Sequence, residues 1–331
     1  MKSGFSLISR EIMKTNYQYL FGPVASRRFG QSLGVDLIPH KTCSLDCVFC
    51  QLGRTQKKTV TRKEYVPIAA VLAEIGDWLE TDGKADYVTL SGSGEPTLNS
   101  RFGQALEFIR EKNTIPAVLL TNGTMLHLPG VRDAAARADV VKVSLSAWDQ
   151  ASYEWVNRPY TQLQFDQVLE GYKTFRREFK GQLWLEVLLL NGINSMIVNI
   201  RKIAALAKDI DPDRIQLNTV VRPPAEDFAA ALPIERMKEL THLFEPPAEI
   251  ISEIKINFTK ELQASEDNIL AMLQRRPCTM KQIEQTFGMH INEISKYLGN
   301  LMQKNCIRTY HKNKDVYYLA VTRENINKAP V

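Results

Sequence analysis

The sequence predicts an α/β fold in which short parallel strands alternate with helices, followed by a small second domain of a different kind. Between Ser32 and Leu243, short apolar segments alternate with longer segments whose apolar residues recur every three or four positions. The short segments are rich in Val, Ile and Leu, as expected for strands that are buried on both faces. From Ser265 onward this alternation stops, which indicates a domain boundary.

Six segments are expected to be strands, with helices between and after them. The strands are Leu33–Ile38, Tyr87–Leu90, Ala117–Leu120, Val140–Leu145, Leu183–Leu190 and Arg214–Val221. The helices are Ile68–Leu79, Arg101–Glu111, Val131–Arg137, Gln164–Arg177, Ile197–Lys208 and Pro233–Leu243. Repeated βα units with right-handed crossovers form either an open doubly wound sheet or a partly closed barrel, and the pattern fits both.

The end of the chain has a different pattern. Residues 246–264 are expected to be a linker between a core domain of residues 1–245 and a C-terminal domain of residues 265–331. In the latter we expect helices and two strands, at Glu266–Arg275, Met280–Phe287, Ile291–Gln303, Ile307–Tyr310 and Val316–Val321. Three short helices followed by a β-hairpin are typical of a winged helix-turn-helix domain.

Bulk properties exclude several classes of protein. Three of the five cysteines lie within eight residues, which argues against a disulfide framework and favours metal binding in a reducing compartment. The N-terminus lacks the apolar core of a secretory signal, and no apolar run approaches the ~18 residues of a transmembrane helix. We therefore expect a cytoplasmic protein that does not bind membranes.

The net charge of +5 is unevenly distributed. Residues 265–331 contain ten Lys and Arg against six Asp and Glu, and residues 54–63 contain five basic and no acidic residues. Such runs are either solvated surface or sites that face phosphate groups, and both readings remain open here.

The motif that carries chemistry is Cys43-x3-Cys47-x2-Cys50, directly after the first expected strand. Three thiolates this close can bind an iron–sulfur cluster. Because such clusters usually take four cysteines, one iron would stay open for a substrate or cofactor. The alternative is a structural zinc site with His40 as the fourth ligand. Zinc sites more often have two Cys-x2-Cys pairs, and a second pair is absent from this sequence.

The cysteine spacing, with the aromatic Phe49 before the last cysteine, resembles the signature of the radical S-adenosylmethionine (SAM) superfamily. Members have a partial (β/α)6 barrel of the TIM type, with the cysteines after the first strand and a Gly-Gly-Glu-Pro-like segment after the second. Here that segment is Gly92-Ser-Gly94-Glu95-Pro96. The resemblance covers roughly residues 33–221, and it implies the barrel rather than the open sheet.

The resemblance also implies two cofactors, a [4Fe-4S] cluster and SAM. Cys43, Cys47 and Cys50 would bind three irons, and the fourth iron would bind the amino and carboxylate groups of SAM. An electron donor such as a flavodoxin or ferredoxin would then drive cleavage of SAM to a 5′-deoxyadenosyl radical, which takes hydrogen from the substrate. Expected SAM contacts are Gly94 and Glu95 at the amino group, Phe49 at the adenine, and Ser144, Ser146, Glu186 and Asn191 at the ribose and carboxylate.

The segments around the cysteines, residues 21–36 and 51–55, resemble the branch that is grouped with the tRNA wyosine (4-demethylwyosine) synthases. The archaeal synthases have a second cysteine set upstream, whereas no cysteine precedes Cys43 in this sequence. The resemblance therefore implies the radical SAM core and not the wyosine reaction.

The substrate leaves a weaker trace in the sequence. Candidates for binding an anionic substrate are Arg27, Arg28, Arg158, Tyr160 and Arg222. We expect an RNA base as the substrate, as in tRNA modification, with the winged helix and the basic segment 54–63 contacting RNA and Lys312 and Lys314 facing phosphates. The alternatives are modification of a protein or peptide, and a DNA-binding regulator that uses the cluster as a redox switch.

Overall fold

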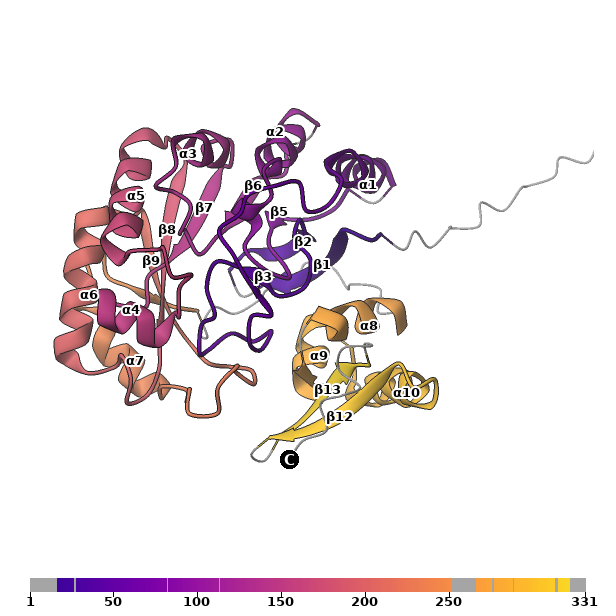
Figure 1. The fold of residues 1–331 in the computed structure, drawn as a ribbon. Helices are drawn as coiled ribbons and strands as arrows, with labels where there is room; N and C mark the ends of the chain where they lie inside the picture. The colour runs from indigo at the N-terminus through magenta and orange to yellow at the C-terminus, as the bar shows by residue number, and fades with distance from the viewer. Residues whose placement is uncertain are drawn as a thin grey trace, which may run out of the picture.

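One eight-stranded sheet forms the centre of the core (Figure 1). The computed structural model describes residues 17–26, 28–81, 83–112, 114–251, 266–275, 277–287, 289–312 and 315–321. In spatial order the strands are β1 (Leu20–Ser26), β2 (Gly30–Val35), β5 (Tyr87–Leu90), β6 (Ala117–Leu120), β7 (Val140–Ser144), β8 (Gln182–Leu189), β9 (Arg214–Thr219) and β10 (Glu249–Ile250). The six expected strands are confirmed, although β2 begins and ends earlier than expected.

The sheet is almost entirely parallel. Only β1 and β2 pair antiparallel, and every other neighbouring pair in this sheet is parallel. Because β1 and β10 lie at opposite ends of the strand order, the described strands form a partial barrel with an open side.

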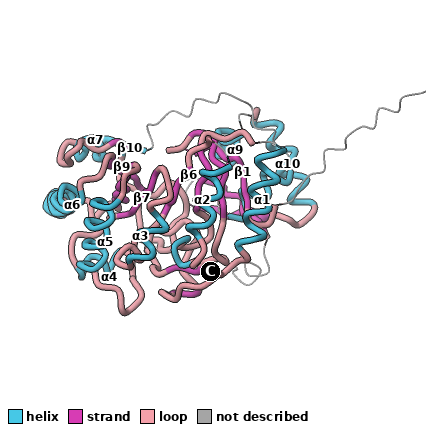
Figure 2. Tube along the Cα trace, turned by 90° about the horizontal axis from the view of Figure 1, so that it is seen from above, coloured by secondary structure: helices cyan, strands magenta, loops and turns pink. Residues whose placement is uncertain are grey.

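Helices cover the outer face of the sheet (Figures 1 and 2). They are α1 (Ile68–Thr81), α2 (Phe102–Lys112), α3 (Pro129–Ala135), α4 (Gln150–Val156), α5 (Phe165–Glu178), α6 (Ile197–Ile210) and α7 (Ile234–Thr241). All of these except α4 match expected helices. The α4 helix begins at a capping box, in which Asp149 accepts from the Ser152 N–H and Ser152 accepts from the Asp149 N–H. None of the described helices is long and apolar enough to cross a membrane.

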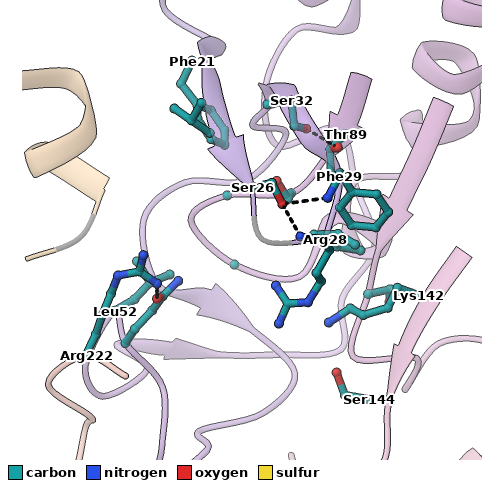
Figure 3. A pocket seen from close by; sticks show the side chains of 18 of the residues that line it. Phe21, Ser26, Arg28, Phe29, Ser32, Leu52, Thr89, Lys142, Ser144 and Arg222 are labelled. Atoms are coloured by element: carbon teal, nitrogen blue, oxygen red, sulfur yellow. Dashed lines mark hydrogen bonds between the residues drawn. The ribbon is translucent and has the colours of Figure 1, made fainter. Parts of the chain in front are cut away.

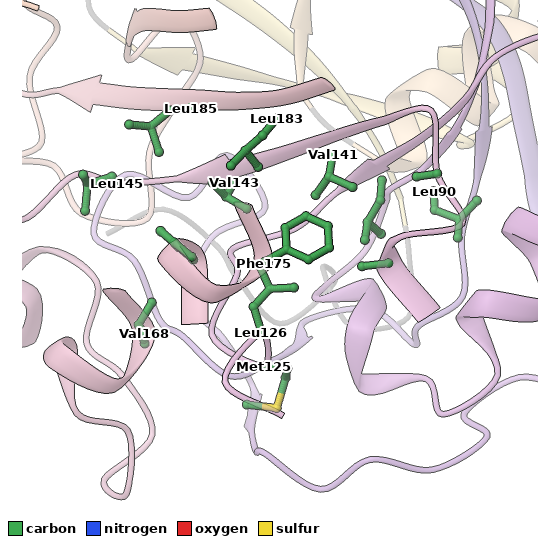
Figure 4. Close-up of a cluster of buried hydrophobic side chains, with 14 of the residues drawn as sticks. Leu90, Met125, Leu126, Val141, Val143, Leu145, Val168, Phe175, Leu183 and Leu185 are labelled. Atoms are coloured by element: carbon green, nitrogen blue, oxygen red, sulfur yellow. The ribbon is translucent and has the colours of Figure 1, made fainter. Parts of the chain in front are cut away.

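Alternation along the strands decides what lines the barrel. Val141, Val143, Leu183 and Leu185 point outward and pack against helices such as α5, where Phe175 is fully buried (Figure 4). Side chains of successive strand residues point to opposite faces. The residues between these apolar positions therefore point into the barrel, which is where β7 and β8 place their polar side chains.

The C-terminal unit, residues 266–321, has its own apolar core. Its elements are α8 (Glu266–Arg275), β11 (Cys278–Thr279), α9 (Met280–Phe287), α10 (Ile291–Gln303), β12 (Ile307–Lys312) and β13 (Asp315–Ala320). The three helices and the hairpin match the expected elements, and β11 adds a third strand beside β13. Buried residues from all three helices, including Ile269, Ile283 and Leu298, form a cluster that is separate from the barrel core.

Two features of the core differ from the expected domain plan. The strand β10 lies within the expected linker and pairs in parallel with β9, so the sheet continues past residue 245. The strand β1 precedes every expected element and forms one end of the sheet. The C-terminal unit lies beside β1, with α8 and α9 in contact with this strand (Figures 1 and 2).

Candidate functional site

A cavity of about 610 Å3 lies at the carboxyl ends of the parallel strands, where α/β barrels bind their ligands (Figure 3). Its lining comes from the β1–β2 hairpin, the loops after β2, β5, β6 and β9, the strand β7 and the C-terminal unit. Among the residues that line it are Phe21, Arg28, Ser32, Cys43, Glu95, Asn122, Lys142, Ser144, Arg222, Met272, Gln282 and Thr286. The edge predicted from the sequence is therefore the edge at which this cavity opens.

Backbone hydrogen bonds hold the cysteine loop, residues 41–58, in shape. Its ends pair as two short parallel strands, β3 (Thr42–Cys43) and β4 (Lys57–Lys58). The Cys50 N–H donates to the Cys47 carbonyl oxygen at 3.1 Å, and the Val48 N–H donates to the Val156 carbonyl oxygen at 3.0 Å. The loop is thus fixed both to itself and to the end of α4.

Each of the three cysteine sulfurs has a side-chain N–H donor. Asn122 Nδ2 lies 3.5 Å from Cys43 Sγ, and Asn157 Nδ2 lies 3.4 Å from Cys47 Sγ. Lys41 Nζ lies 3.2 Å from Cys50 Sγ, although Lys41 is only 3% exposed. Such donors stabilise sulfur in its negatively charged form.

The cysteines lie in a dry environment. Burial raises the pKa of Cys43 to about 12, and the carboxylate of Glu95 adds to this shift. Burial and the neighbouring thiols Cys43 and Cys50 raise the pKa of Cys47 further. Thiolates in such a place require a cationic partner, and the positive irons of a cluster supply one. The three sulfurs therefore fit an iron–sulfur cluster.

The zinc alternative is not supported by the described residues. No group of three or more His, Cys, Asp or Glu among them is arranged to hold a single metal ion. His40, the expected fourth ligand, is exposed at the surface. A cluster spaces its ligands more widely than one ion does, because each thiolate binds a separate iron.

Glu95 follows β5 and is 2% exposed. Its Oε1 accepts from the Thr97 N–H at 3.0 Å and the Thr121 hydroxyl at 2.6 Å, and its Oε2 accepts from the Asn122 N–H at 2.7 Å. Burial raises the pKa of Glu95, while these hydrogen bonds lower it. No ion pair among the described residues involves Glu95. Ionised Glu95 would therefore hold a negative charge that only neutral donors surround.

The Glu95 loop is attached directly to the cysteine loop. The Glu95 N–H donates to the Thr42 carbonyl oxygen at 3.1 Å, and the Lys41 N–H donates to the Ser93 carbonyl oxygen at 2.7 Å. A side chain at Gly94 would collide with the same Thr42 oxygen, which explains why glycine is needed there.

A charged cluster lies inside the barrel, and we call Arg28, Lys142, Glu186 and Asn218 the interior cluster. Lys142 Nζ lies 3.0 Å from Glu186 Oε2, to which Arg28 Nη2 also donates. Asn218 Nδ2 donates to Glu186 Oε1 at 3.3 Å. Burial alone would raise the pKa of Glu186, but Arg28 and Lys142 outweigh it and lower this pKa to about 2. Burial lowers the pKa of Lys142.

A second cavity of about 150 Å3 also borders the cysteine loop. Phe49, Ser144 and Ser146 line it together with Cys47. Three of the predicted SAM contacts therefore gather around one space, and Ser144 also borders the large cavity. Ser146 is largely occupied, since its Oγ accepts from the Leu188 N–H at 3.3 Å.

The other predicted residues lie in different places. Asn191 is exposed and its N–H donates to the Ala230 carbonyl oxygen, so the structure does not bring it to either cavity. Arg158 pairs with Glu226, and Tyr160 donates its backbone N–H to the Ser44 carbonyl oxygen. Both stabilise the surroundings of the cysteine loop. Arg27 lies outside the described residues.

Of the predicted anion-binding residues, Arg28 and Arg222 do line the large cavity. Figure 3 shows Arg28 extending toward Lys142, while Arg222 lies on another side near Leu52. Arg222 Nη1 donates to Gln51 Oε1 at 3.0 Å. The two arginines therefore border different parts of the cavity.

The C-terminal unit closes part of the cavity. Met272 from α8 and Gln282 and Thr286 from α9 form this wall. Gln282 Nε2 donates to the Val221 carbonyl oxygen at 3.2 Å, just after β9. Lys312, expected to face phosphate, instead pairs with Asp227 of the core at 2.7 Å, and Lys314 lies outside the described residues.

Sequence reasoning missed Lys142, Lys41, Asn122 and Asn157. Lys142 could have been identified from the sequence, because it is a charged residue within an otherwise apolar strand segment. Asn122 follows the third expected strand but was not assigned a role at the cysteines. The donor role of the other two depends on contacts that no local pattern reveals.

The arrangement of the cysteine loop and Glu95 agrees with the resemblance seen in the sequence, and a match to a family model identifies the family. Residues 37–204 match the Radical SAM superfamily. The chain belongs to the radical SAM superfamily. It is accordingly an enzyme whose cofactors are a [4Fe-4S] cluster and SAM, as predicted. This radical SAM chain also belongs to the UPF0026 proteins. It is 33% identical over 275 residues to one from Methanocaldococcus jannaschii, covering 80% of this chain and 84% of that protein.

Two further relatives match parts of longer proteins. A protein of Brachyspira hyodysenteriae named GTPase Obg is 34% identical over 301 residues, and the match spans 89% of this chain but 44% of that protein. A Heliobacterium modesticaldum protein named "Probable dual-specificity RNA methyltransferase RlmN" is 28% identical over 209 residues, which are 57% of this chain and 54% of that protein.

A solved structure shows the same fold. The structure of TYW1 with a lysine-pyruvate adduct bound has a TM-score of 0.50 and 18% identity, and the match covers 66% of this chain and 74% of that chain. At this identity the likeness supports the mostly parallel, partial-barrel fold and nothing more. The resemblance to the wyosine branch therefore stays a prediction.

Proposed function

We propose that Cys43, Cys47 and Cys50 hold the [4Fe-4S] cluster and that the enzyme cleaves SAM to a 5′-deoxyadenosyl radical, which takes hydrogen from an RNA base. The observation that carries this proposal is the meeting of two groups at one cavity. The cysteine sulfurs each have an N–H donor, and the negatively charged Glu95 lies on a loop that is bonded to theirs. One group suits a cluster and the other suits the ammonium of SAM.

The residues of this chain have separable roles in the reaction. When bound, the cluster supplies the electron that breaks the sulfonium C–S bond of SAM. Asn122, Asn157 and Lys41 donate to the cysteine sulfurs, and hydrogen bonds of this kind tune the reduction potential of a cluster. Glu95 accepts from the SAM ammonium in a charge-assisted hydrogen bond.

The two cavities divide the contacts to SAM and substrate. We assign Phe49, Ser144 and Ser146 to the adenosine part of SAM, because they line the small cavity beside Cys47. Glu186 is already paired with two cations, so we assign it to the interior cluster rather than to SAM. The large cavity, with Cys43 and Glu95 at one end and the C-terminal unit at the other, is left for the substrate.

Three observations support RNA as the substrate. A relative is named as an RNA methyltransferase. Lys57 and Lys58 of the basic segment are exposed. The C-terminal unit, which forms one wall of the cavity, has the element order of a winged helix. An enzyme that modifies a base must draw it out of its stack into such a pocket. Lys312 is engaged with Asp227, so Arg308 and His311 on β12 are the better candidates for phosphate contact.

The metal site is tested by anaerobic reconstitution with iron and sulfide. The chain should bind about four irons, and Cys43→Ala, Cys47→Ala and Cys50→Ala should each lose the cluster. Cys278→Ala and Cys306→Ala are matched controls, because Cys278 is buried in the apolar core of the C-terminal unit and Cys306 packs against that core. Stoichiometric zinc without iron uptake, or loss of iron in either control, would contradict this ligand set.

The reaction is tested by mass spectrometry of the products. Reduced enzyme with SAM should release 5′-deoxyadenosine, and anaerobic capture followed by sequencing should recover RNA. Absence of 5′-deoxyadenosine would reject SAM cleavage. Capture of peptides with no RNA would move the substrate to the protein alternative, while leaving the cleavage step intact.

A further inference from the structure

The interior cluster has more positive than negative charge. Arg28 and Lys142 both line the large cavity, whereas Glu186 is the carboxylate that they share. Glu95 also acts on the charge of Lys142. In the proposed function, however, the charge of Glu95 is neutralised by the SAM ammonium. With SAM bound, Arg28, Lys142 and Glu186 therefore leave one positive charge without a counterion at the cavity wall.

Two buried side chains, one in the interior cluster and one next to it, have atoms without a hydrogen-bond partner. The Nε of Arg28 has none, although Arg28 Nη2 is bound to Glu186. Gln216 is 0% exposed, and neither its amide oxygen nor its amide nitrogen has a partner among the described residues. Gln216 is paired in register with Glu186 on the neighbouring strand, so both side chains point into the barrel. Buried polar groups are rarely left unbonded. Because Arg28 lines the large cavity and Gln216 does not, Arg28 is the one of the two that a ligand in the cavity can complete.

The interior cluster is not needed to seal the barrel. Deeper in the barrel, Phe29 stacks on Trp184 with ring centroids 5.1 Å apart, and Val118 and Val140 pack around them. This apolar layer already closes the interior. A purely structural filling next to it would be more stable if it were apolar too, because buried ion pairs recover their desolvation cost only with good geometry.

We propose that Arg28 and Lys142, which both line the large cavity, bind a singly charged oxyanion of the substrate, either a carboxylate or a phosphodiester. The inference rests on the proposed function in that the same cavity receives the radical. Arg28 keeps an N–H for the ligand while Glu186 holds its other nitrogen, and Lys142 supplies a second positive donor. Because Cys43 borders the same cavity, an anion held here would orient the rest of the substrate toward the SAM end.

Thermal unfolding of the full chain with SAM present tests this site with defined probes. Sodium acetate represents a carboxylate and sodium dimethyl phosphate a phosphodiester, each compared with sodium chloride at equal ionic strength. The melting temperature should rise with at least one probe, because a ligand that binds only the folded state stabilises it. Arg28→Met should abolish the rise. Arg176→Met, which removes an outer ion pair with Asp213, should retain it.

A second variant separates binding from structure. Gln216→Leu removes an unbonded amide that does not line the cavity, so its melting temperature without probe should be higher than that of the wild type, while its response to the probe should be unchanged. A rise with acetate alone assigns a carboxylate, and a rise with dimethyl phosphate alone assigns an RNA backbone group. No rise with either probe, or an unchanged rise in Arg28→Met, overturns the site.

The release of 5′-deoxyadenosine keeps the two proposals distinguishable. If the wild type releases 5′-deoxyadenosine but neither probe has an effect, the anion site fails and SAM cleavage stands. If no 5′-deoxyadenosine forms yet a probe binds through Arg28, the proposed function fails and the anion site stands.

Discussion

Two buried glutamates differ in the kind of group that surrounds them: Glu95 lines the large cavity, and Glu186 is bound to Arg28 and Lys142, which line it. Glu95 accepts from two backbone N–H groups and two hydroxyls, all of them neutral. Glu186 accepts from Lys142 and Arg28, both of them cations. The pKa of Glu95 is raised by burial, whereas the pKa of Glu186 is lowered to about 2 despite burial, because the two cations outweigh it.

The difference shows how one residue type acquires two roles. Neutral donors orient the Glu95 carboxylate without cancelling its charge, so it can still attract a cation such as the SAM ammonium. The charge of Glu186 is already used by its neighbours, and its role is to hold Arg28 and Lys142 in place. Breaking each site should therefore affect a different measurement.

The largest effect is expected for Glu186→Leu. This change leaves Arg28 and Lys142 buried without their anion, and removing one partner of a buried ion pair costs ~3–5 kcal/mol. Urea unfolding should show this loss of stability. The control is Glu245→Gln, which breaks the exposed pair with Lys208 and should leave unfolding nearly unchanged. Equal effects of the two changes would show that the interior cluster contributes little.

Glu95→Gln should mainly weaken SAM binding. A charge-assisted hydrogen bond contributes ~1.5–3 kcal/mol, so the affinity should fall by roughly tenfold or more. The measurement is SAM titration of reconstituted protein with its iron content confirmed. The amide of Gln would also oppose the Asn122 N–H, so a urea series should accompany the titration. Unchanged SAM affinity would exclude Glu95 as the ammonium acceptor.

The loss of folding stability at acidic pH should depend in part on Glu186. Its pKa is about 2 in the folded chain and 4.5 ordinarily, so its ion pairs stabilise the fold above pH 4.5 and are lost as the pH falls toward 2. Within that window this group should contribute a decrease of ~1.4 kcal/mol per pH unit in the free energy of unfolding. Glu186→Gln should remove this part of the slope, as urea unfolding at several acidic pH values would reveal. An unchanged slope would contradict the lowered pKa.

The smallest effect concerns the wall that closes the cavity. Lys312 and Asp227 lie 2.7 Å apart, so a carbodiimide should join their side chains directly by an amide bond. Mass spectrometry of digested protein should find the linked peptides, and Asp227→Asn should lack them. The link between Lys208 and Glu245 should form in both proteins and serves as the control. Failure to form the link would show that the C-terminal unit does not lie against the core at this point. The surroundings of the two glutamates would then be set by the barrel without this wall.

Sequence patterns predicted the parallel strands and most helices, because burial on both faces produces long apolar runs. The strand β1 was missed because Gly22 and Pro23 interrupt it, and proline is tolerated in a strand at the sheet edge. The helix α4 was missed because its signal is the capping box of Asp149 and Ser152 rather than an apolar period. The two-residue strand β10 depends on its pairing with β9 rather than on its own sequence.

The candidate site was predictable where the residues lie close together in sequence. The cysteines and Glu95 lie on short motifs, whereas Asn122 and Asn157 reach their cysteines across 79 and 110 residues. Arg158 was predicted to bind substrate, but its partner Glu226 is 68 residues away, and only the fold reveals that pair. Charge in a sequence shows that a partner is needed and does not show which one.

The backbone carbonyl oxygen of Thr42 connects the cysteine loop to the Glu95 loop, and this connection affects how the cluster and SAM bind. This carbonyl precedes Cys43, accepts the Glu95 N–H and leaves no room for a side chain at Gly94. Ordering of the cysteine loop by a cluster should thus also order the loop that carries Glu95, and the reverse. The two cofactors should show positive cooperativity, in which each raises the affinity for the other by the same factor. Iron delivery would then prime the enzyme for SAM, and an apoprotein would consume little of it.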